Sequence, residues 1–145
     1  MDKALDKAMN YCSRPEHCIE DIRQKLWDWK VPEDEHEKII TTLIDNNFIN
    51  EERYAVAFVK DKFHFNHWGR IKIRMMLKAK KIGTAIIDDA ISCIDDDEYF
   101  EVLRNLIEKE STRVKATTGY ERKSKLLRYV ANRGFEPSIA SELIF

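Results

Sequence analysis

One spacing of apolar residues occurs three times along the 145-residue chain. Two apolar residues stand four positions apart, and a third follows five positions later. The copies are Ile22-x3-Leu26-x4-Val31, Ile73-x3-Leu77-x4-Ile82 and Leu126-x3-Val130-x4-Phe135. Residues four apart lie on one face of a helix, and a recurring unit packs against its neighbours. The spacing therefore predicts three tandem units of about fifty residues, although any amphipathic helix offers such residues and chance recurrence is the alternative.

Turn-forming residues are rare and stand between the apolar runs. The chain has 4 Gly and 3 Pro, too few for the many tight turns of an all-β protein. Apolar residues recur three and four positions apart, and each proline stands where a first helical turn needs no N–H donor. We predict an all-α protein with helices over about 3–12, 16–29, 33–46, 51–63, 69–80, 84–94, 97–112, 120–132 and 137–144.

These helices group by threes into repeats covering residues 1–50, 51–94 and 95–145. Each repeat is too small to bury a good core alone, so we expect the repeats to pack in a row as an elongated, curved molecule. The longest apolar run, Ala55–Val59, has five residues, and the first residues lack a signal-peptide pattern. We expect a cytoplasmic monomer that makes no membrane contact.

Charge is divided unevenly among the repeats. The chain has 25 Lys and Arg against 26 Asp and Glu, a formal net charge of −1. Residues 1–50 carry 7 basic and 11 acidic residues, residues 51–94 carry 9 and 5, and residues 95–145 carry 9 and 10. The basic residues of the second and third repeats gather around the second helix of each. Near-neutrality thus conceals two basic regions, which favour a polyanionic partner.

The basic residues of helix 69–80 are predicted to flank its buried face. Ile73 and Leu77 define the buried side. One stripe beside it contains Arg70, Arg74, Lys78 and Lys81. Such a stripe can follow phosphates or an acidic protein groove, and the alternative is a helix face that is merely solvated. The candidate binding residues are Lys60, Lys62, Arg70, Lys72, Arg74, Lys78 and Lys81 in the second repeat and Arg122, Lys123, Lys125, Arg128 and Arg133 in the third.

Aromatic residues adjoin this stripe. Nucleic-acid sites combine aromatic stacking with positive charge, which Phe63, Phe65 and Trp68 could supply together. Taken one by one, we predict that these three side chains fill the core. We predict the same of Trp27 and Trp29 in the first repeat, where a partner anchor is the alternative.

Signals for catalysis or metal binding are weak. No GxxxxGK[ST], GxGxxG, GxSxG or HExxH motif occurs. Cys12, His17 and Cys18 could be drawn as zinc ligands, but no recognised spacing completes the site. Three cysteines without a CxxC pair indicate reduced structural thiols. The run Asp95–Glu98 is explained as a helix N-terminus. We predict a protein without enzymatic activity, cofactor or metal.

Three further stretches form a pattern across nearly the whole chain. Phe48 to Val59, FINEERYAVAFV, precedes Gly69-x-Ile71 and the basic run that ends at Lys81-Ile82. Near the start stands Ala4-Leu5, then Ser13-Arg14-x-Glu16-His17; near the end stands Arg133-Gly134-Phe135. Together these stretches resemble the RecX family of RecA regulators. The sequence departs from that family at Cys18, where a small hydroxyl residue is usual, and at Gly83-Thr84, where an acidic cap is usual.

The resemblance implies a helical, three-repeat protein that binds the RecA recombinase filament on DNA. It implies that the protein restrains the ATPase and strand-exchange activities of the filament and catalyses nothing itself. The basic residues named above would then contact the filament or its DNA, single- or double-stranded. Two alternatives remain open: an independent helical DNA-binding module, and a helical scaffold for protein contacts only.

Overall fold

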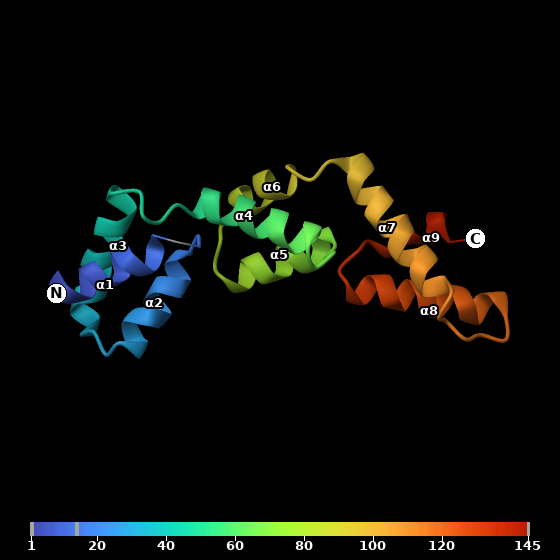
Figure 1. Cartoon of the computed structure of the whole chain (residues 1–145), viewed down its shortest axis with the longest axis horizontal. Coiled ribbons are helices and arrows are strands. Elements are labelled where there is room, and N and C mark those ends of the chain that lie inside the picture. The colour runs from blue at the N-terminus through green and yellow to red at the C-terminus, as the bar shows by residue number, and fades with distance from the viewer. Residues whose placement is uncertain (1, 14, 145) are drawn as a thin grey trace. The chain divides into compact units, whose positions relative to one another are not determined.

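The computed structural model describes residues 2–13 and 15–144, and within them every regular element is helical (Figure 1). The all-α prediction is therefore confirmed, while Arg14 of the opening motif lies outside the described residues. In chain order the helices are α1 (Asp2–Cys12), α2 (Ile19–Asp28), the 3-10 turn η1 (Glu33–Glu35), α3 (His36–Asp45), α4 (Glu51–His64), α5 (Arg70–Ala79), α6 (Thr84–Ile91), α7 (Asp96–Ser111), α8 (Gly119–Asn132) and α9 (Pro137–Leu143).

The packing divides the chain into two compact units. The first comprises residues 1–58 and 77–90, and the second comprises residues 59–76 and 91–145. The division passes through α4 and α5, so each unit takes part of the middle helices. The repeat boundaries at residues 50 and 94 remain a prediction.

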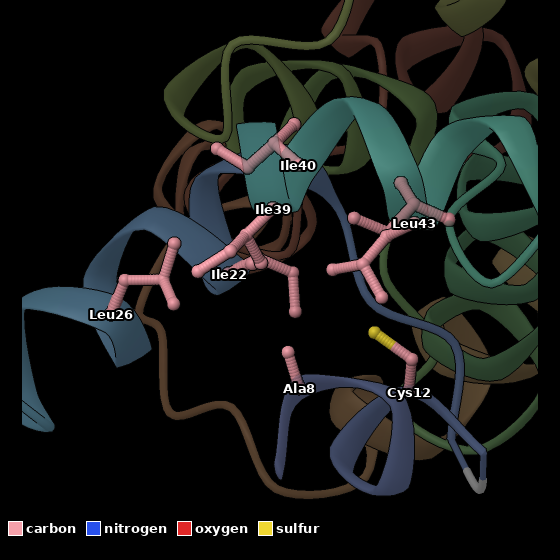
Figure 2. Close-up of a cluster of buried hydrophobic side chains, with 8 residues drawn as sticks. Ala8, Cys12, Ile22, Leu26, Ile39, Ile40 and Leu43 are labelled. Carbon is pink, nitrogen blue, oxygen red and sulfur yellow. The ribbon is translucent and has the colours of Figure 1, made fainter. Parts of the chain in front are cut away.

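In the first unit, one face of each of α1, α2 and α3 is buried. Figure 2 shows Ala8 and Cys12 of α1 facing side chains of α2 and α3. The buried side chains are Ala8, Cys12, Ile22, Leu26, Ile39, Ile40, Leu43 and Ile49. Burial, with Glu16 and Asp21 nearby, raises the pKa of the Cys12 thiol to about 11. Cys12 is thus a neutral packing group, as the interpretation of the cysteines as structural thiols requires.

The repeated apolar spacing is the C-terminal end of a helix. In the first copy, Val31 donates its N–H to the carbonyl of Leu26 at 3.0 Å, and Lys30 donates to Trp27 at 3.0 Å. Lys30 has a φ of 60°, the left-handed conformation of a Schellman motif. The same bonds join Ile82 to Leu77 around Lys81 and Phe135 to Val130 around Gly134. The four residues that separate the second apolar residue from the third in each copy are therefore the sequence separation that a Schellman motif imposes on its two contacting apolar residues.

Replacing Lys30 by glycine should stabilise the first unit. A left-handed φ costs a residue with a Cβ roughly 1–2 kcal/mol, part of which glycine loses again through its greater freedom in the unfolded chain. We expect the free energy of unfolding, measured by urea denaturation, to rise by about 0.5–1 kcal/mol. Lys30→Ala is the control, because it removes the charge and keeps the Cβ. A gain in Lys30→Ala equal to that in Lys30→Gly would contradict this explanation.

Several helix boundaries differ from the sequence prediction, and the predicted helix 84–94 ends at Ile91. Helix α2 begins at Ile19 and not near Pro15, because Cys18 has extended backbone at the N-cap and Asp21 accepts its N–H at 3.3 Å. The predicted helix 33–46 is split into η1 and α3 at His36. Trp27 was expected in the core but is exposed, and its ring lies edge-on to His36 at 4.9 Å between centroids.

Candidate functional site

Arg70 does not belong to an exposed basic stripe. Its guanidinium donates to Asp96 at 2.7 Å and to Glu136 at 3.2 Å, and its Cζ lies 3.9 Å from the ring centroid of Tyr99. These contacts join the start of α5 to the starts of α7 and α9 within the second unit. Arg70 is therefore a structural cation, and its charge is already matched by two carboxylates.

Tyr99 also joins the start of α5 to the start of α9, and it does so from the protein interior. The side chain is buried, its hydroxyl accepts the N–H of Arg70 at 3.0 Å, and it donates to Glu136 at 2.5 Å. Burial, together with the bond to Glu136, raises the pKa of Tyr99 well above its usual value. The hydroxyl thus keeps the proton that it donates.

The substitution Tyr99→Phe should lower the free energy of unfolding by about 2 kcal/mol. The partly buried N–H of Arg70 would lose its acceptor and Glu136 would lose a donor, with little change in packing volume. Chemical denaturation measures the loss, and Tyr120→Phe is the control because Tyr120 is exposed. Equal stability of the two variants would show that the hydroxyl of Tyr99 does not hold the junction.

Two ammonium groups lie over the ring of Trp68, in the link between α4 and α5. The Nζ of Lys72 is 4.4 Å from the ring centroid and that of Lys62 is 5.1 Å from it. Each side chain is partly buried. The ring quadrupole attracts a cation placed over the aromatic face. The arrangement presents positive charge and an aromatic ring at one place on the second unit.

Arg133 lies next to this link because the backbone of the link is bonded to the end of α8. The N–H of Gly69 donates to the carbonyl of Arg133 at 2.7 Å, and that of Ile71 donates to Gly134 at 3.0 Å. The Arg133 guanidinium donates to the carbonyl of Asn66 at 3.2 Å. We call Lys62, Trp68, Lys72 and Arg133 the Trp68 cluster.

The close backbone contact requires glycine on both sides. A Cβ on Gly69 would stand 2.3 Å from the carbonyl carbon of Gly134. A Cβ on Gly134, whose φ is +93°, would stand 2.3 Å from the Cβ of Lys72. The two glycines thus hold Lys72 and Arg133 on neighbouring segments, whereas Gly83 and Gly119 have no atom within 4 Å of an added Cβ.

The remaining candidates of the second repeat lie elsewhere. Lys60, Lys78 and Lys81 are exposed, and Arg74 is partly buried on α5. The Nζ of Lys81 is 3.5 Å from Glu20 in the first unit. The role of these four side chains in binding remains a prediction.

A neighbouring lysine that is not among the candidate binding residues makes a closer ion pair in the first unit. Lys80 donates to Asp21 at 2.6 Å. Burial alone would raise the pKa of Asp21, but the bonds from Lys80 and from the Cys18 N–H lower it below its usual value. The same bond raises the pKa of Lys80. Asp21 and Lys80 thus form a stable pair that attaches the end of α5 to α2.

The basic residues predicted on α8 do not share one face. Residues in a helix advance by about 100° each, so Arg122, Lys123, Lys125 and Arg128 together wrap more than half of its circumference. Lys125 pairs with Glu121 at 3.0 Å, and Arg122 lines a hollow beside α7 and α9. Of the five candidates in the third repeat, only Arg133 lies in the Trp68 cluster.

The aromatic residues divide between core and surface. Phe63 is buried, as predicted, and its ring stacks on Tyr99 at 5.8 Å. Phe65 is 81% exposed, so its assignment to the core is wrong. Phe65 follows the last residue of α4, where the chain turns away from the buried face. Trp68 is partly buried and, as described above, is covered by cations.

The acidic run before α7 has two roles. Asp95 is the N-cap, as predicted, and its carboxylate accepts the N–H of Glu98 at 2.9 Å. Asp96 in the next position pairs with Arg70. Among residues 2–13 and 15–144, no group of three or more His, Cys, Asp or Glu side chains could hold a metal ion. Within those same ranges no helix is long and apolar enough to cross a bilayer.

Comparison with known protein families identifies the family to which this chain belongs. Residues 50–91 match the model described as the second three-helix domain of RecX, and residues 96–144 match that of the third. The regulatory protein RecX of Clostridium beijerinckii is 30% identical over 144 residues, covering 98% of this chain and 67% of that protein. The chain belongs to the RecX family of regulatory proteins, which confirms the resemblance seen in the sequence.

Other relatives are longer than this chain. The RecX protein of Leuconostoc mesenteroides is 27% identical over 142 residues, and that of Lactococcus lactis is 31% identical over 137 residues. The alignments cover 98% and 92% of this chain but 53% and 51% of the relatives. The chain thus spans about half the length of these curated relatives.

Solved structures match in fold. A crystal structure of a regulatory protein RecX has a TM-score of 0.90 and 26% identity, covering 98% of this chain and 70% of the other. The RecX structure from Lactobacillus salivarius has a TM-score of 0.87 and 26% identity, with coverages of 99% and 93%. Tandem three-helix domains are therefore the architecture of this chain.

Proposed function

We propose that this protein binds RecA-type recombinase filaments on DNA and restrains their ATP hydrolysis and strand exchange, without catalysing a reaction itself. The observation that carries the proposal is the Trp68 cluster in a chain of the RecX family. Such a filament displays both protein and DNA phosphates, so a regulator that binds it needs at least one surface suited to phosphate.

The chemistry of the Trp68 cluster suits a nucleic-acid strand. Lys62, Lys72 and Arg133 supply three positive charges, of which that of Lys62 is partly offset by Asp61 at 3.9 Å. Positive charge near phosphates releases condensed counterions. The indole of Trp68 holds the Lys62 and Lys72 ammonium groups over its ring, so that both charges lie at one place. Grouped positive charges bind a DNA backbone with little base preference, as a protein that acts along a filament requires.

The acidic first repeat argues against DNA contact along the whole chain. Residues 1–50 carry a net charge of −4, because 7 basic residues oppose 11 acidic ones. Phosphates would be repelled there, whereas a basic protein surface would be attracted. We therefore assign DNA contact to the second repeat and the adjoining end of the third.

Sedimentation tests the proposal directly. A RecA-type recombinase is assembled on single-stranded DNA with a slowly hydrolysed ATP analogue, and the filaments are pelleted with this protein present. We expect the protein in the pellet with filaments, and less of it with an equal amount of DNA alone. Absence from the filament pellet would refute the proposal.

The same experiment separates the second candidate function, an independent DNA-binding module. The Trp68 cluster favours this candidate too, because its chemistry would serve on free DNA. That function predicts equal sedimentation with free DNA and with filaments, and a preference among DNA sequences. Indifference to the recombinase would decide in its favour.

A further inference from the structure

A hollow of about 160 Å³ lies between the link from α4 to α5 and one face of α7. It is lined by His67 of the link and by Val102, Asn105, Leu106 and Lys109 of α7. The four α7 residues have the i, i+3, i+4, i+7 spacing of a single helix face. All five residues belong to the second unit. We call this feature the His67 hollow, and the Trp68 cluster does not include it.

The walls of the His67 hollow combine apolar and polar groups. Leu106 is buried and Val102 is partly buried, so the two form an apolar floor. His67, Asn105 and Lys109 are exposed. Within residues 2–13 and 15–144, no hydrogen bond or ion pair involves the side chains of these three residues. The imidazole, the amide and the ammonium group can therefore all contact a ligand.

We propose that the His67 hollow receives one unpaired base of a DNA strand whose phosphates lie on the Trp68 cluster. The inference rests on the proposed function and deepens it, because it adds a base contact to the contacts with the DNA backbone. His67 links the two sites, since it directly precedes Trp68 and the Cα atoms of neighbouring residues are about 3.8 Å apart. A strand that follows the Trp68 cluster therefore passes beside the hollow.

Each wall of the hollow matches one part of a nucleotide. A base is flat and aromatic, so the imidazole of His67 offers it a stacking surface and the apolar floor offers van der Waals contact. The Asn105 amide has donors and an acceptor, and every base edge carries groups that pair with one or the other. The Lys109 ammonium suits the phosphate of the same nucleotide. Stacking depends little on the identity of the base, which agrees with the weak base preference expected of the Trp68 cluster.

The lining favours a base in a strand over other occupants. An apolar side chain of a partner protein would cover the floor but leave the Asn105 amide without a hydrogen bond. A free phosphate or carboxylate would meet one ammonium group, that of Lys109, and an apolar floor that does not stabilise an anion. A free nucleotide would fit the hollow, but only a strand also reaches the positive charges of the Trp68 cluster.

Two substitutions test the hollow. His67→Gly removes the imidazole and preserves the fold, because the φ of 53° at this residue suits glycine. Asn105→Ala removes the amide at an exposed position of α7, where alanine is a good helix former. We expect His67→Gly to bind a labelled 30-nucleotide single strand at least fivefold more weakly, and Asn105→Ala at least threefold. The matched control is Asn47→Gly, which makes the same kind of change at a φ of 62° in the first unit and should leave the affinity unchanged.

The salt dependence of these variants separates base contact from phosphate contact. The slope of log affinity against log salt should remain that of the wild-type protein, because neither substitution removes a positive charge that neutralises a phosphate. A clearly shallower slope would mean that the variants had lost phosphate contacts, and it would overturn the inference.

A strand without bases gives the most direct test. A 30-nucleotide strand that is abasic at every position keeps all its phosphates, and the wild-type protein should bind it at least fivefold more weakly than the intact strand. His67→Gly should bind the two strands with nearly equal affinity, because the contact that distinguishes them is gone. Equal binding of the two strands by the wild-type protein would overturn the inference.

The other outcomes are equally decisive. Wild-type affinity of both variants for the intact strand would overturn the inference and leave the proposed function intact, since sedimentation with filaments tests that function separately. Release of the labelled strand by a mononucleotide at the same nucleotide concentration as by an unlabelled strand would assign the hollow to a free nucleotide and overturn the inference. A wild-type protein that neither binds the strand nor sediments with filaments would refute the proposed function and the inference together.

Discussion

The substitution Gly69→Ala should lower the free energy of unfolding by about 3 kcal/mol or more. The added Cβ would stand 2.3 Å from the carbonyl carbon of Gly134 and 2.4 Å from the N of Phe135. Both are backbone atoms, so no side-chain rotation relieves the clash. The Gly69–Arg133 and Ile71–Gly134 hydrogen bonds would lengthen or break as the two segments separate. Denaturation in urea measures the loss.

Gly119→Ala is the matched control for this prediction. Gly119 begins α8, and a Cβ there meets nothing within 4 Å. Alanine in the first turn of a helix is at least as favourable as glycine, so stability should stay equal or rise by up to about 1 kcal/mol. Similar stability of Gly69→Ala and Gly119→Ala would refute the close approach of residues 69 and 134.

The double substitution Lys62→Glu with Lys72→Glu should weaken binding to single-stranded DNA by about 100-fold at low salt. Two attractive charges over Trp68 become two repulsive ones at the place where we expect the backbone phosphates. The slope of log affinity against log salt should become shallower by more than 1, because at least two phosphate contacts are lost. Fluorescence anisotropy at several salt concentrations gives both quantities.

The control for the double substitution carries the same change in net charge at another place. Lys3→Glu with Lys38→Glu alters two exposed residues of the acidic first repeat. This pair should reduce DNA affinity only slightly and leave the salt slope nearly unchanged. If both pairs weakened binding equally, the effect would come from total charge, and the Trp68 cluster would lose its assignment as the DNA site.

Sequence periodicity predicted the helices and much of the core because both depend on local spacing. Ile73 and Leu77 are buried, as their four-residue interval on a basic helix indicated. The longer interval, from Leu26 to Val31, also has a local cause, since a Schellman motif closes over six residues. Such features are properties of a short segment, and a sequence displays them directly.

Sequence periodicity could not predict contacts between residues that are far apart in the chain. Arg70 was grouped with Arg74 by position on the helix, but its carboxylate partners, Asp96 and Glu136, are 26 and 66 residues away. The acidic run that contains Asp96 was recognised in the sequence. Helix capping was a sufficient explanation for it, so no ion pair with Arg70 was predicted. The positions of basic residues around one isolated helix do not predict which other helices pack against it.

The Trp68 cluster was predicted only in part. The sequence placed Lys62 and Lys72 near an aromatic residue, yet it indicated that Trp68 fills the core. Arg133 belonged to another repeat, and only the pairing of Gly69 with Gly134 brings it to the link. Both glycines had been interpreted as joints between helices. Their contact with each other depends on tertiary packing, which has no signature in the spacing.

Whether this protein restrains a recombinase filament is measured by the rate of DNA-stimulated ATP hydrolysis by a RecA-type recombinase. The wild-type protein and the Lys62→Glu, Lys72→Glu variant are each titrated into a reaction with preformed filaments. We expect the wild-type protein to lower the rate progressively to a plateau. The variant should require at least a tenfold higher concentration for the same effect. A rate that stays constant up to a large molar excess of the wild-type protein would contradict the proposed function.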